Sequence, residues 1–261
     1  MPHTGVEEKT PWRNVPAAVK AETARLLGSP VARATRAWGG YGPTPTCRLR
    51  LRDGRRAFIK GVNADSNDFM RRALDSELRI YRELSHVIEG HPPAYLGSFK
   101  FDDWSLLLLE DAGPKTVPPW TASLTRAVVG ELAAFHDSTA RHSLPEWVHT
   151  PGLVASSERR TRRCAFGLEE MAACAVLAGS KASEAEEWIK AHGPVLAEVS
   201  ARLSDDSFNR ILIHGNVRSD NLRLVDGRLV MFDWPQASNF PPECALTVFA
   251  QSMTVEGGPD P

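Results

Sequence analysis

The chain has 261 residues, 42% of them hydrophobic and 24% charged, and its formal net charge is −1. This length can bury a core in one large domain or in two smaller lobes. No stretch approaches the ~20 apolar residues of a membrane span, and the net charge gives no overall attraction for nucleic acid. We therefore expect neither a membrane nor a nucleic acid as a partner.

The amino-terminal residues and the cysteines indicate a cytoplasmic protein. The first twelve residues lack the basic start and apolar stretch of a secretory signal. The four cysteines are widely spaced, without a CxxC pair, and are predicted to be reduced packing residues: Cys47, Cys164, Cys174 and Cys244.

Strand and helix patterns alternate in the first half of the chain. Asp53-Gly54 joins two alternating runs, a strong signal for a tight two-residue hairpin turn. In chain order, the pattern predicts a helix near Val15 to Leu27, two strands within Cys47 to Lys60, a helix from Phe69 to Ser85, and strands at Ala94 to Phe99 and Ser105 to Leu109.

The segment after Glu110 breaks this pattern, because it contains Gly113-Pro114 and Pro118-Pro119. We place a lobe boundary here, with an amino-terminal lobe at 1–111 and a helical lobe at 112–261. Helices are predicted at Ala122 to Thr139, Ser157 to Ala178, Ser183 to Leu203 and Glu243 to Ser252, and a hairpin at Leu222 to Phe232. The predicted fold class is α+β, with a small β-rich lobe and a larger helical lobe.

The second hairpin brings two oxygen-bearing side chains together. If Asp226-Gly227 forms its turn, Asn221 lies opposite Phe232, and Asp233 follows at the same open end. An amide oxygen and a carboxylate in this position can bind Mg²⁺, which takes few protein oxygens together with water and phosphate. The alternative is that Asn and Asp only cap the strand ends, as they often do.

A similar argument places Lys60 opposite Cys47 on the first hairpin, beside the turn that contains Gly39 and Gly40. Glycines there would let backbone amides approach a phosphate, and Lys60 would add a positive charge. Glu77, on the next helix, can hold the ammonium in an ion pair. The alternatives are an ordinary turn, a solvated lysine and a solvated helix face.

The order of these features resembles the layout of protein-kinase-like folds. The loop from His214 to Asn221 reads HGNVRSDN and is followed by FDW, which ends at Trp234. These residues resemble the HGDxxxxN and DW motifs of the aminoglycoside phosphotransferase and choline kinase superfamily. The resemblance covers roughly Trp38 to Trp234 and implies a bilobal fold that transfers the γ-phosphate of ATP to a hydroxyl group of a small molecule.

The resemblance also implies a role for each matching residue. Glu77 would orient Lys60 toward the α- and β-phosphates, and Asn221 and Asp233 would bind Mg²⁺. His214 would brace the loop, or would only be a satisfied core histidine. Arg218 would contact the transferring phosphoryl group, or would only be a solvated surface residue. Gly39 and Gly40 would approach the phosphates, and backbone groups from Glu110 to Ala112 would contact adenine.

Asn216 departs from the resemblance, because the family has a catalytic aspartate at this position. An amide has no useful basicity, but it can still position a hydroxyl group. Asp220 is a poor substitute at the hairpin entry. We expect low residual turnover, because a general base is worth ~10²- to 10⁴-fold and phosphoryl transfer depends mainly on alignment and charge.

The carboxyl end departs as well. Only 28 residues follow Asp233, and no acidic residue lies between Cys244 and Met253, where the family often braces the loop with an aspartate. Part of the acceptor site is therefore expected to be missing. Three hypotheses follow: a phosphotransferase weakened by Asn216, a nucleotide-binding pseudokinase without transfer, and a degenerate fragment. An antibiotic, a sugar, choline and a homoserine-like metabolite all remain open as acceptors.

Overall fold

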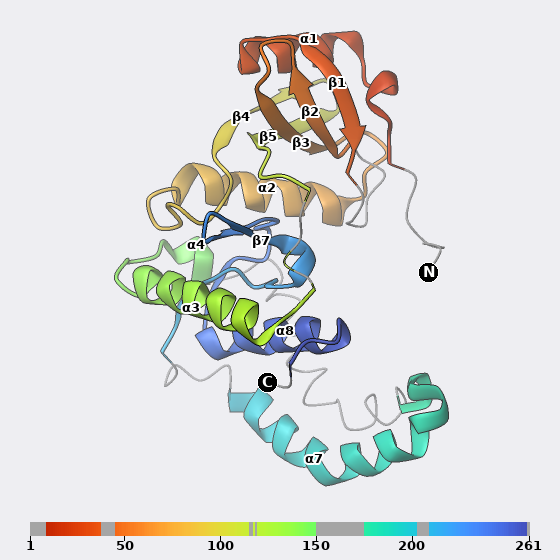
Figure 1. The fold of residues 1–261 in the computed structure, drawn as a ribbon, viewed down its shortest axis with the longest axis vertical. Coiled ribbons are helices and arrows are strands. Elements are labelled where there is room, and N and C mark those ends of the chain that lie inside the picture. Colours follow the sequence, from red (N-terminus) through yellow and green to blue (C-terminus); the bar gives the residue numbers. More distant parts are fainter. Residues whose placement is uncertain are drawn as a thin grey trace.

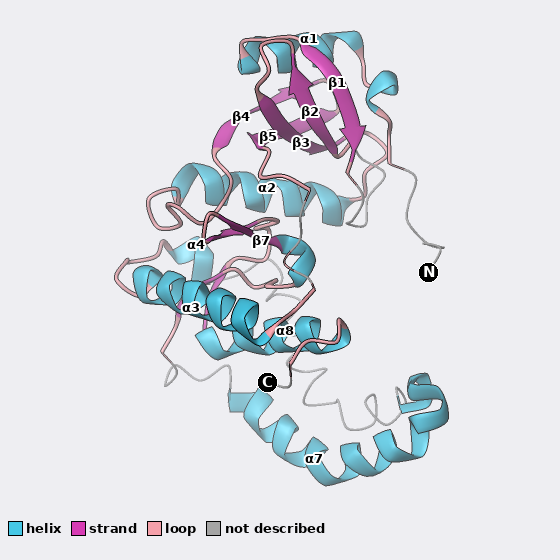
Figure 2. Ribbon diagram, viewed as in Figure 1, coloured by secondary structure: helices cyan, strands magenta, loops and turns pink. Residues whose placement is uncertain are grey.

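The computed structural model describes residues 9–37, 45–114, 117, 119–149, 175–202 and 209–259. Figure 1 shows a sheet-rich part at one end, with helix α2 (Asp68–Glu83) beneath it and a mainly helical part below α2. Figure 2 shows the same division by element type, with most strands in the upper part. The predicted α+β class, with a small β-rich part followed by a larger helical part, is confirmed.

The sheet-rich part is a five-stranded antiparallel sheet in the order β1-β2-β3-β5-β4. A short 3₁₀ helix and α1 precede the sheet, and α2 interrupts it between β3 and β4. The elements other than α2 are η1 (Trp12–Asn14), α1 (Ala17–Leu27), β1 (Val31–Arg36), β2 (Cys47–Leu51), β3 (Arg56–Val62), β4 (Tyr95–Phe101) and β5 (Trp104–Glu110).

The two faces of this sheet have different surroundings, because side chains alternate along each strand. One face packs against α1 and buries Cys47, Leu49, Ala57 and Ile59 with Val19. The opposite face of β3 carries Arg56, Phe58 and Lys60. That face looks toward α2 and the helical part, where Leu107 and Leu109 join the second core.

The register predicted for the first hairpin is wrong by one residue. Cys47 pairs with Ile59 rather than with Lys60. The Gly54 N–H donates to the Leu51 carbonyl at 3.1 Å, and Gly54 has a φ of 90°, so the turn spans Leu51–Gly54 and carries a glycine bulge. The bulge adds one residue, because Gly54 takes the left-handed conformation while Asp53 does not.

The helical part surrounds two small antiparallel sheets, β6-β9 and β7-β8. Its helix α3 starts at the Thr121 cap, whose side chain accepts from the Leu124 N–H. The elements are α3 (Ala122–Thr139), α4 (Glu146–His149), η2 (Ala175–Lys181), α7 (Ala182–Arg202), β6 (Ile211–Ile213), η3 (Ser219–Asn221), β7 (Leu222–Val225), β8 (Arg228–Met231), β9 (Ser238–Phe240) and α8 (Pro242–Val255).

The second hairpin has the predicted register. Val225 pairs with Arg228 and Leu224 with Leu229, and the Phe232 N–H donates to the Asn221 carbonyl at 2.9 Å. Asp226 and Gly227 have φ values of 51° and 81°. Both residues are therefore left-handed, as a two-residue type I′ turn requires.

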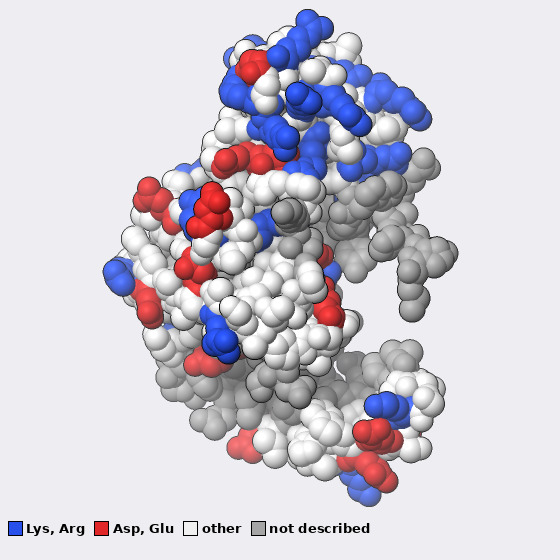
Figure 3. All heavy atoms as spheres, viewed as in Figure 1, with Lys and Arg blue, Asp and Glu red and all other residues white. Residues whose placement is uncertain are grey.

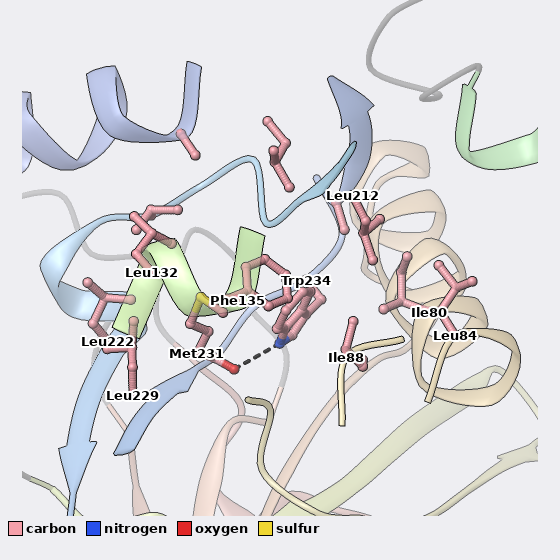
Figure 4. Packing of buried hydrophobic residues seen from close by; sticks show 14 of the residues in the cluster. Ile80, Leu84, Ile88, Leu132, Phe135, Leu212, Leu222, Leu229, Met231 and Trp234 are labelled. Atoms are coloured by element: carbon pink, nitrogen blue, oxygen red, sulfur yellow. Dashed lines mark hydrogen bonds between the residues drawn. The ribbon is translucent and has the colours of Figure 1, made fainter. Parts of the chain in front are cut away.

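Trp234 lies at the centre of the core that joins the two parts. Figure 4 shows it between Phe135 of α3, Leu212 of β6 and the side chains of α2. Its indole is fully buried and donates to the Met231 carbonyl at 2.8 Å. The residue after Asp233 is thus held by packing from both parts of the molecule.

Other predicted elements agree to within a few residues. The helix at Ala122 to Thr139 has the predicted bounds, and β4 and β5 meet at a turn where Asp102 has a φ of 47°. Most of the helix predicted at Ser157 to Ala178 lies outside the described residues. None of the described helices combines the length and apolar content needed to cross a bilayer.

Two glycines test how closely β3 packs. An added Cβ at Gly61 would lie 2.5 Å from the Ser105 carbonyl oxygen and closer still to Leu106, whereas at Gly130 of α3 it meets nothing within 4 Å. We expect Gly61→Ala to lower the free energy of unfolding by ~1–3 kcal/mol through overpacking. Gly130→Ala should raise it by ~0.5–1 kcal/mol through helix propensity.

Urea unfolding of both variants measures this difference. A Gly61→Ala variant as stable as the Gly130→Ala variant would contradict the close approach of β3 and β5.

Candidate active site

Lys60 joins three elements of the fold. Its ammonium forms an ion pair with Glu77 of α2, and a second one with Asp233 Oδ1, after β8, at 2.8 Å. The Glu77 side chain is only 1% exposed and that of Lys60 is 18% exposed. The predicted pairing of Lys60 with Glu77 is therefore present, and Asp233 completes a cluster that we call the lysine–carboxylate cluster.

The charges in this cluster depend on one another. Burial disfavours the Lys60 cation, but Asp233 and Glu77 outweigh burial, so the pKa of Lys60 is raised. The Lys60 ammonium in turn lowers the pKa of Asp233. Burial raises the pKa of Glu77, and Lys60 opposes that rise. The cluster thus holds one cation between a buried carboxyl group, that of Glu77, and a second one, that of Asp233, whose side chain is 47% exposed.

The backbone around Asp233 is also constrained. Asp233 has a φ of 64°, in the left-handed region that non-glycine residues rarely adopt. The next N–H, of Trp234, donates to Glu77 Oε1 at 3.4 Å. This link and the burial of Trp234 hold Asp233 in the conformation that points its carboxylate at Lys60.

His214 ties the loop that starts after β6 to the chain after β8. Its Nε2–H donates to the Phe232 carbonyl at 2.7 Å, and its Nδ1 accepts from the Asn216 N–H at 3.3 Å. The ring is fully buried and stacks edge-on against Trp234 at 4.5 Å. Both ring nitrogens are used by the neutral tautomer, so His214 braces the loop.

The backbone at position 215 accounts for the glycine in the loop motif. Its φ is 75°, and an added Cβ would collide with the carbonyl group of Gln236. Only glycine combines that conformation with that approach. The next residue, Asn216, uses its backbone groups within the loop, and its side-chain amide has no hydrogen bond among the described residues.

Asn221 lies at the open end of the second hairpin, as predicted, and is 9% exposed. Its Nδ2 donates to the Asn216 carbonyl at 3.0 Å, which leaves the amide oxygen for another partner. Asp233 likewise uses only Oδ1 for Lys60. Among the described residues, no group of three or more His, Cys, Asp or Glu could hold a metal ion.

Arg218 does not point into the lysine–carboxylate cluster. Its guanidinium pairs with Asp220 through bonds of 3.1 and 2.8 Å, and both side chains are more than 40% exposed. This arrangement matches the solvated alternative. A role for Arg218 at a phosphoryl group therefore stays a prediction, and Asp220 is occupied by the same pair.

The linker after β5 carries an ion pair that was not predicted from the sequence. The guanidinium of Arg48, on β2, forms an ion pair with the Asp111 carboxylate, with Nε 3.0 Å from Oδ1. The Asp111 side chain is 7% exposed. The flanking Glu110 N–H donates to the Ala94 carbonyl at 2.9 Å. The Ala112 N–H has no partner within the described part of the chain. Gly39 and Gly40 lie outside the described residues.

Two residues, one in α8 and one directly after it, brace the loop that follows β6. Ser252 Oγ accepts from the Ser219 N–H at 3.0 Å, and Glu256 accepts from the Ser219 hydroxyl. Glu256 also accepts from Trp120 Nε1 at 2.8 Å. Ser219 begins η3, the turn that ends at Asn221. Sequence reasoning missed this brace, because Glu256 lies beyond the segment in which an acidic residue was sought.

No family model matches the chain, and no curated protein matches it in sequence. Solved structures do match the fold. An aminoglycoside-3′-phosphotransferase of type VIII is 17% identical, with a TM-score of 0.57 over 92% of this chain and 87% of its own. An amicoumacin kinase in complex with AMP-PNP and Ca²⁺ is 12% identical, with a TM-score of 0.62 over 92% and 70%.

A third structure is an aminoglycoside phosphotransferase from Streptomyces rimosus in complex with ADP and streptomycin. It is 15% identical and has a TM-score of 0.58 over 94% of this chain and 86% of its own. Identities this low establish the fold alone. The chain therefore has the bilobal, protein-kinase-like fold of the aminoglycoside phosphotransferases, as the loop motif predicted.

The lysine–carboxylate cluster predicts an asymmetric response to mutation. Lys60→Met leaves the buried Glu77 carboxylate unpaired and should cost ~3–5 kcal/mol of unfolding free energy. In the double variant Lys60→Met/Glu77→Gln, the amide can still accept from the Trp234 N–H, and no buried charge remains. The double variant should therefore be more stable than the single one in urea unfolding. Equal midpoints for the two variants would show that Glu77 does not depend on Lys60.

His214 predicts how stability changes with pH. Burial is the main reason that its pKa is lowered to about 4. Because the unfolded chain has a histidine pKa of ~6.5, the stabilisation is complete above that pH and is lost as pH falls toward 4. The loss should amount to ~3 kcal/mol over this interval. Urea unfolding between pH 7.5 and 4.5 measures it, with His214→Gln as the control. An identical pH slope in the parent and the variant would contradict the assignment.

Proposed function

We propose that the chain is an ATP-dependent phosphotransferase, acting in the cytoplasm on a hydroxyl group of a small molecule and weakened by Asn216. The observation that carries this proposal is the lysine–carboxylate cluster, together with Asn221 on the adjoining loop. Lys60, Glu77 and Asp233 come from three separate elements and share one contact network. In this proposal the Lys60 ammonium binds the phosphates of ATP, and Glu77 fixes the position of the Lys60 side chain.

The proposed nucleotide site runs along the face of β3 that carries Lys60. Phe58, two residues earlier on the same face, is half-buried and would lie against the base. The Ala112 N–H and backbone groups near Glu110 would contact the edge of the base. This division assigns 1–111 to nucleotide binding and 112–261 to the catalytic loop and the acceptor.

The donor atoms fit a magnesium ion that arrives with the triphosphate. Asn221 offers its amide oxygen and Asp233 the carboxylate oxygen that Lys60 leaves free. Mg²⁺ is commonly held by one or two protein oxygens plus phosphate and water. When bound, the ion would neutralise charge on the phosphates, while His214 and Trp234 keep the two protein ligands in place.

The Asn216 side chain would accept a hydrogen bond from the acceptor hydroxyl group without removing its proton. The side chain has no hydrogen bond within the described residues, so the amide oxygen can accept from a hydroxyl group. The similar structures include enzymes in complex with streptomycin and with an amicoumacin-type ligand. We infer a hydroxylated small molecule as the acceptor class.

A second candidate function is nucleotide binding without transfer. Asn216 itself favours it, because the general base is absent at the position where the fold places it. Both functions predict Mg·ATP binding, so only turnover separates them.

The experiment is to restore the base. Asn216→Asp should raise Mg·ATP hydrolysis, with water as acceptor, by up to ~10²- to 10⁴-fold, because the carboxylate can accept the proton. The affinity for Mg·ATP, measured by calorimetry, should change little. Transfer to a panel of aminoglycosides, amino alcohols and sugars should rise in parallel for any true acceptor.

The matched control is Asn216→Asp/Asp233→Ala, which keeps the new base and removes a proposed metal ligand. It should lose both the gain in hydrolysis and the Mg²⁺ dependence of ATP binding. If Asn216→Asp binds Mg·ATP as the parent does and yet gains no turnover, the phosphotransferase assignment is wrong and the binding function stands. A parent that binds no ATP with or without Mg²⁺ sinks both.

A further inference from the structure

Positive charge is concentrated in one part of this nearly neutral chain. Residues 9–62 carry twelve Lys and Arg against two Asp and Glu, a net charge of +10, while the remainder of the chain carries −11. Figure 3 shows Lys and Arg gathered over the end formed by α1 and β1–β3. The expectation that no nucleic acid binds rests on the net charge of the whole chain. That sum does not show that positive and negative charges lie in different parts of the chain.

Three arginines form a row across neighbouring strands. Arg33 of β1 pairs with Arg50 of β2, which in turn pairs with Arg56 of β3. Residues that pair directly across strands lie on the same face, with strands ~4.8 Å apart, so the arginine row is ~10 Å long. All three residues are exposed.

The arginine row has no acidic partner among the described residues. Its neighbours differ, since Arg48 pairs with Asp111 and Arg55 with Asp53. Like charges directly opposite one another destabilise a sheet. Neighbouring strands lie ~4.8 Å apart, which is less than the ~8 Å screening length of physiological salt, so salt does not fully screen the repulsion between the three arginines. A bound anion would relieve it.

The arginine row lies beside the proposed nucleotide site without blocking it. Arg56 is on the same face of β3 as Phe58 and Lys60, and four residues of strand put it ~13 Å from Lys60. The row therefore lies beyond the proposed base site. A ligand there would run across β1, β2 and β3 at one end of the sheet and leave the nucleotide site open.

We propose that the arginine row binds the phosphate backbone of a nucleic acid. Guanidinium groups match phosphate oxygens in a two-pronged geometry that lysine cannot supply. One strand of a duplex presents a phosphate every ~3.4 Å of axis, or about three along the row. An extended acidic peptide presents a side chain on one face only every ~6.8 Å, so it would supply one or two carboxylates.

The test measures binding of a fluorescent 20-base-pair duplex of mixed sequence to the full chain between 50 and 200 mM salt. Three neutralised phosphates predict that affinity falls about 40-fold over this range. Arg33→Gln/Arg50→Gln/Arg56→Gln should bind more weakly and lose most of the salt dependence. Its Mg·ATP affinity should equal that of the parent, and its urea midpoint should be equal or higher because the repulsion is gone.

The matched control is Arg72→Gln/Arg126→Gln/Arg141→Gln, which removes the same charge from exposed positions of α2, α3 and the chain after α3. It should bind the duplex as the parent does. The proposal is overturned if both triple variants bind equally, if the parent does not bind the duplex at 50 mM salt, or if a 20-residue glutamate peptide binds as tightly as the duplex. The last result would identify an acidic protein as the partner. The outcome does not depend on whether the chain transfers phosphate.

Discussion

The buried carboxylate of Glu77 is the constraint on which the site depends. A carboxylate that is 1% exposed persists only when a cation and hydrogen-bond donors replace water. Lys60 supplies the cation from β3, and the Trp234 N–H supplies a donor from the chain after β8. The groups that satisfy this one charge thus come from the sheet and from the chain after the second hairpin, and the two parts of the fold meet at α2.

Packing then converts that meeting point into a defined geometry. Trp234 contacts Phe135 edge-on at 5.8 Å and His214 at 4.5 Å, so the residue after Asp233 and the loop before Asn216 share one buried surface. Ser252 and Glu256 hold the far end of the loop at Ser219. The loop is therefore fixed at both ends, and the backbone of Asn216 is held between them.

Sequence reasoning succeeded where local chemistry decides the structure. The Asp226-Gly227 turn set the register of the second hairpin and so placed Asn221 beside Asp233. The same dipeptide at Asp53-Gly54 misled, because a glycine bulge there adds one residue. The Lys60–Asp233 contact spans 173 residues and that of Ser219 with Glu256 spans 37. The resemblance placed Lys60 and Asp233 in one site but did not predict their contact, and no periodicity or motif predicted the second pair.

The Lys60 ammonium occupies the place of a counter-ion at Asp233. A divalent ion at the free oxygen of Asp233 would lie close to the Lys60 ammonium, and repulsion between the two cations would weaken the binding of metal alone. A triphosphate changes the balance, since it gives the ammonium another anion to contact and gives the metal further oxygen ligands. Binding of metal and binding of nucleotide would therefore depend on each other. Without either ligand, the Lys60 ammonium neutralises the Asp233 carboxylate.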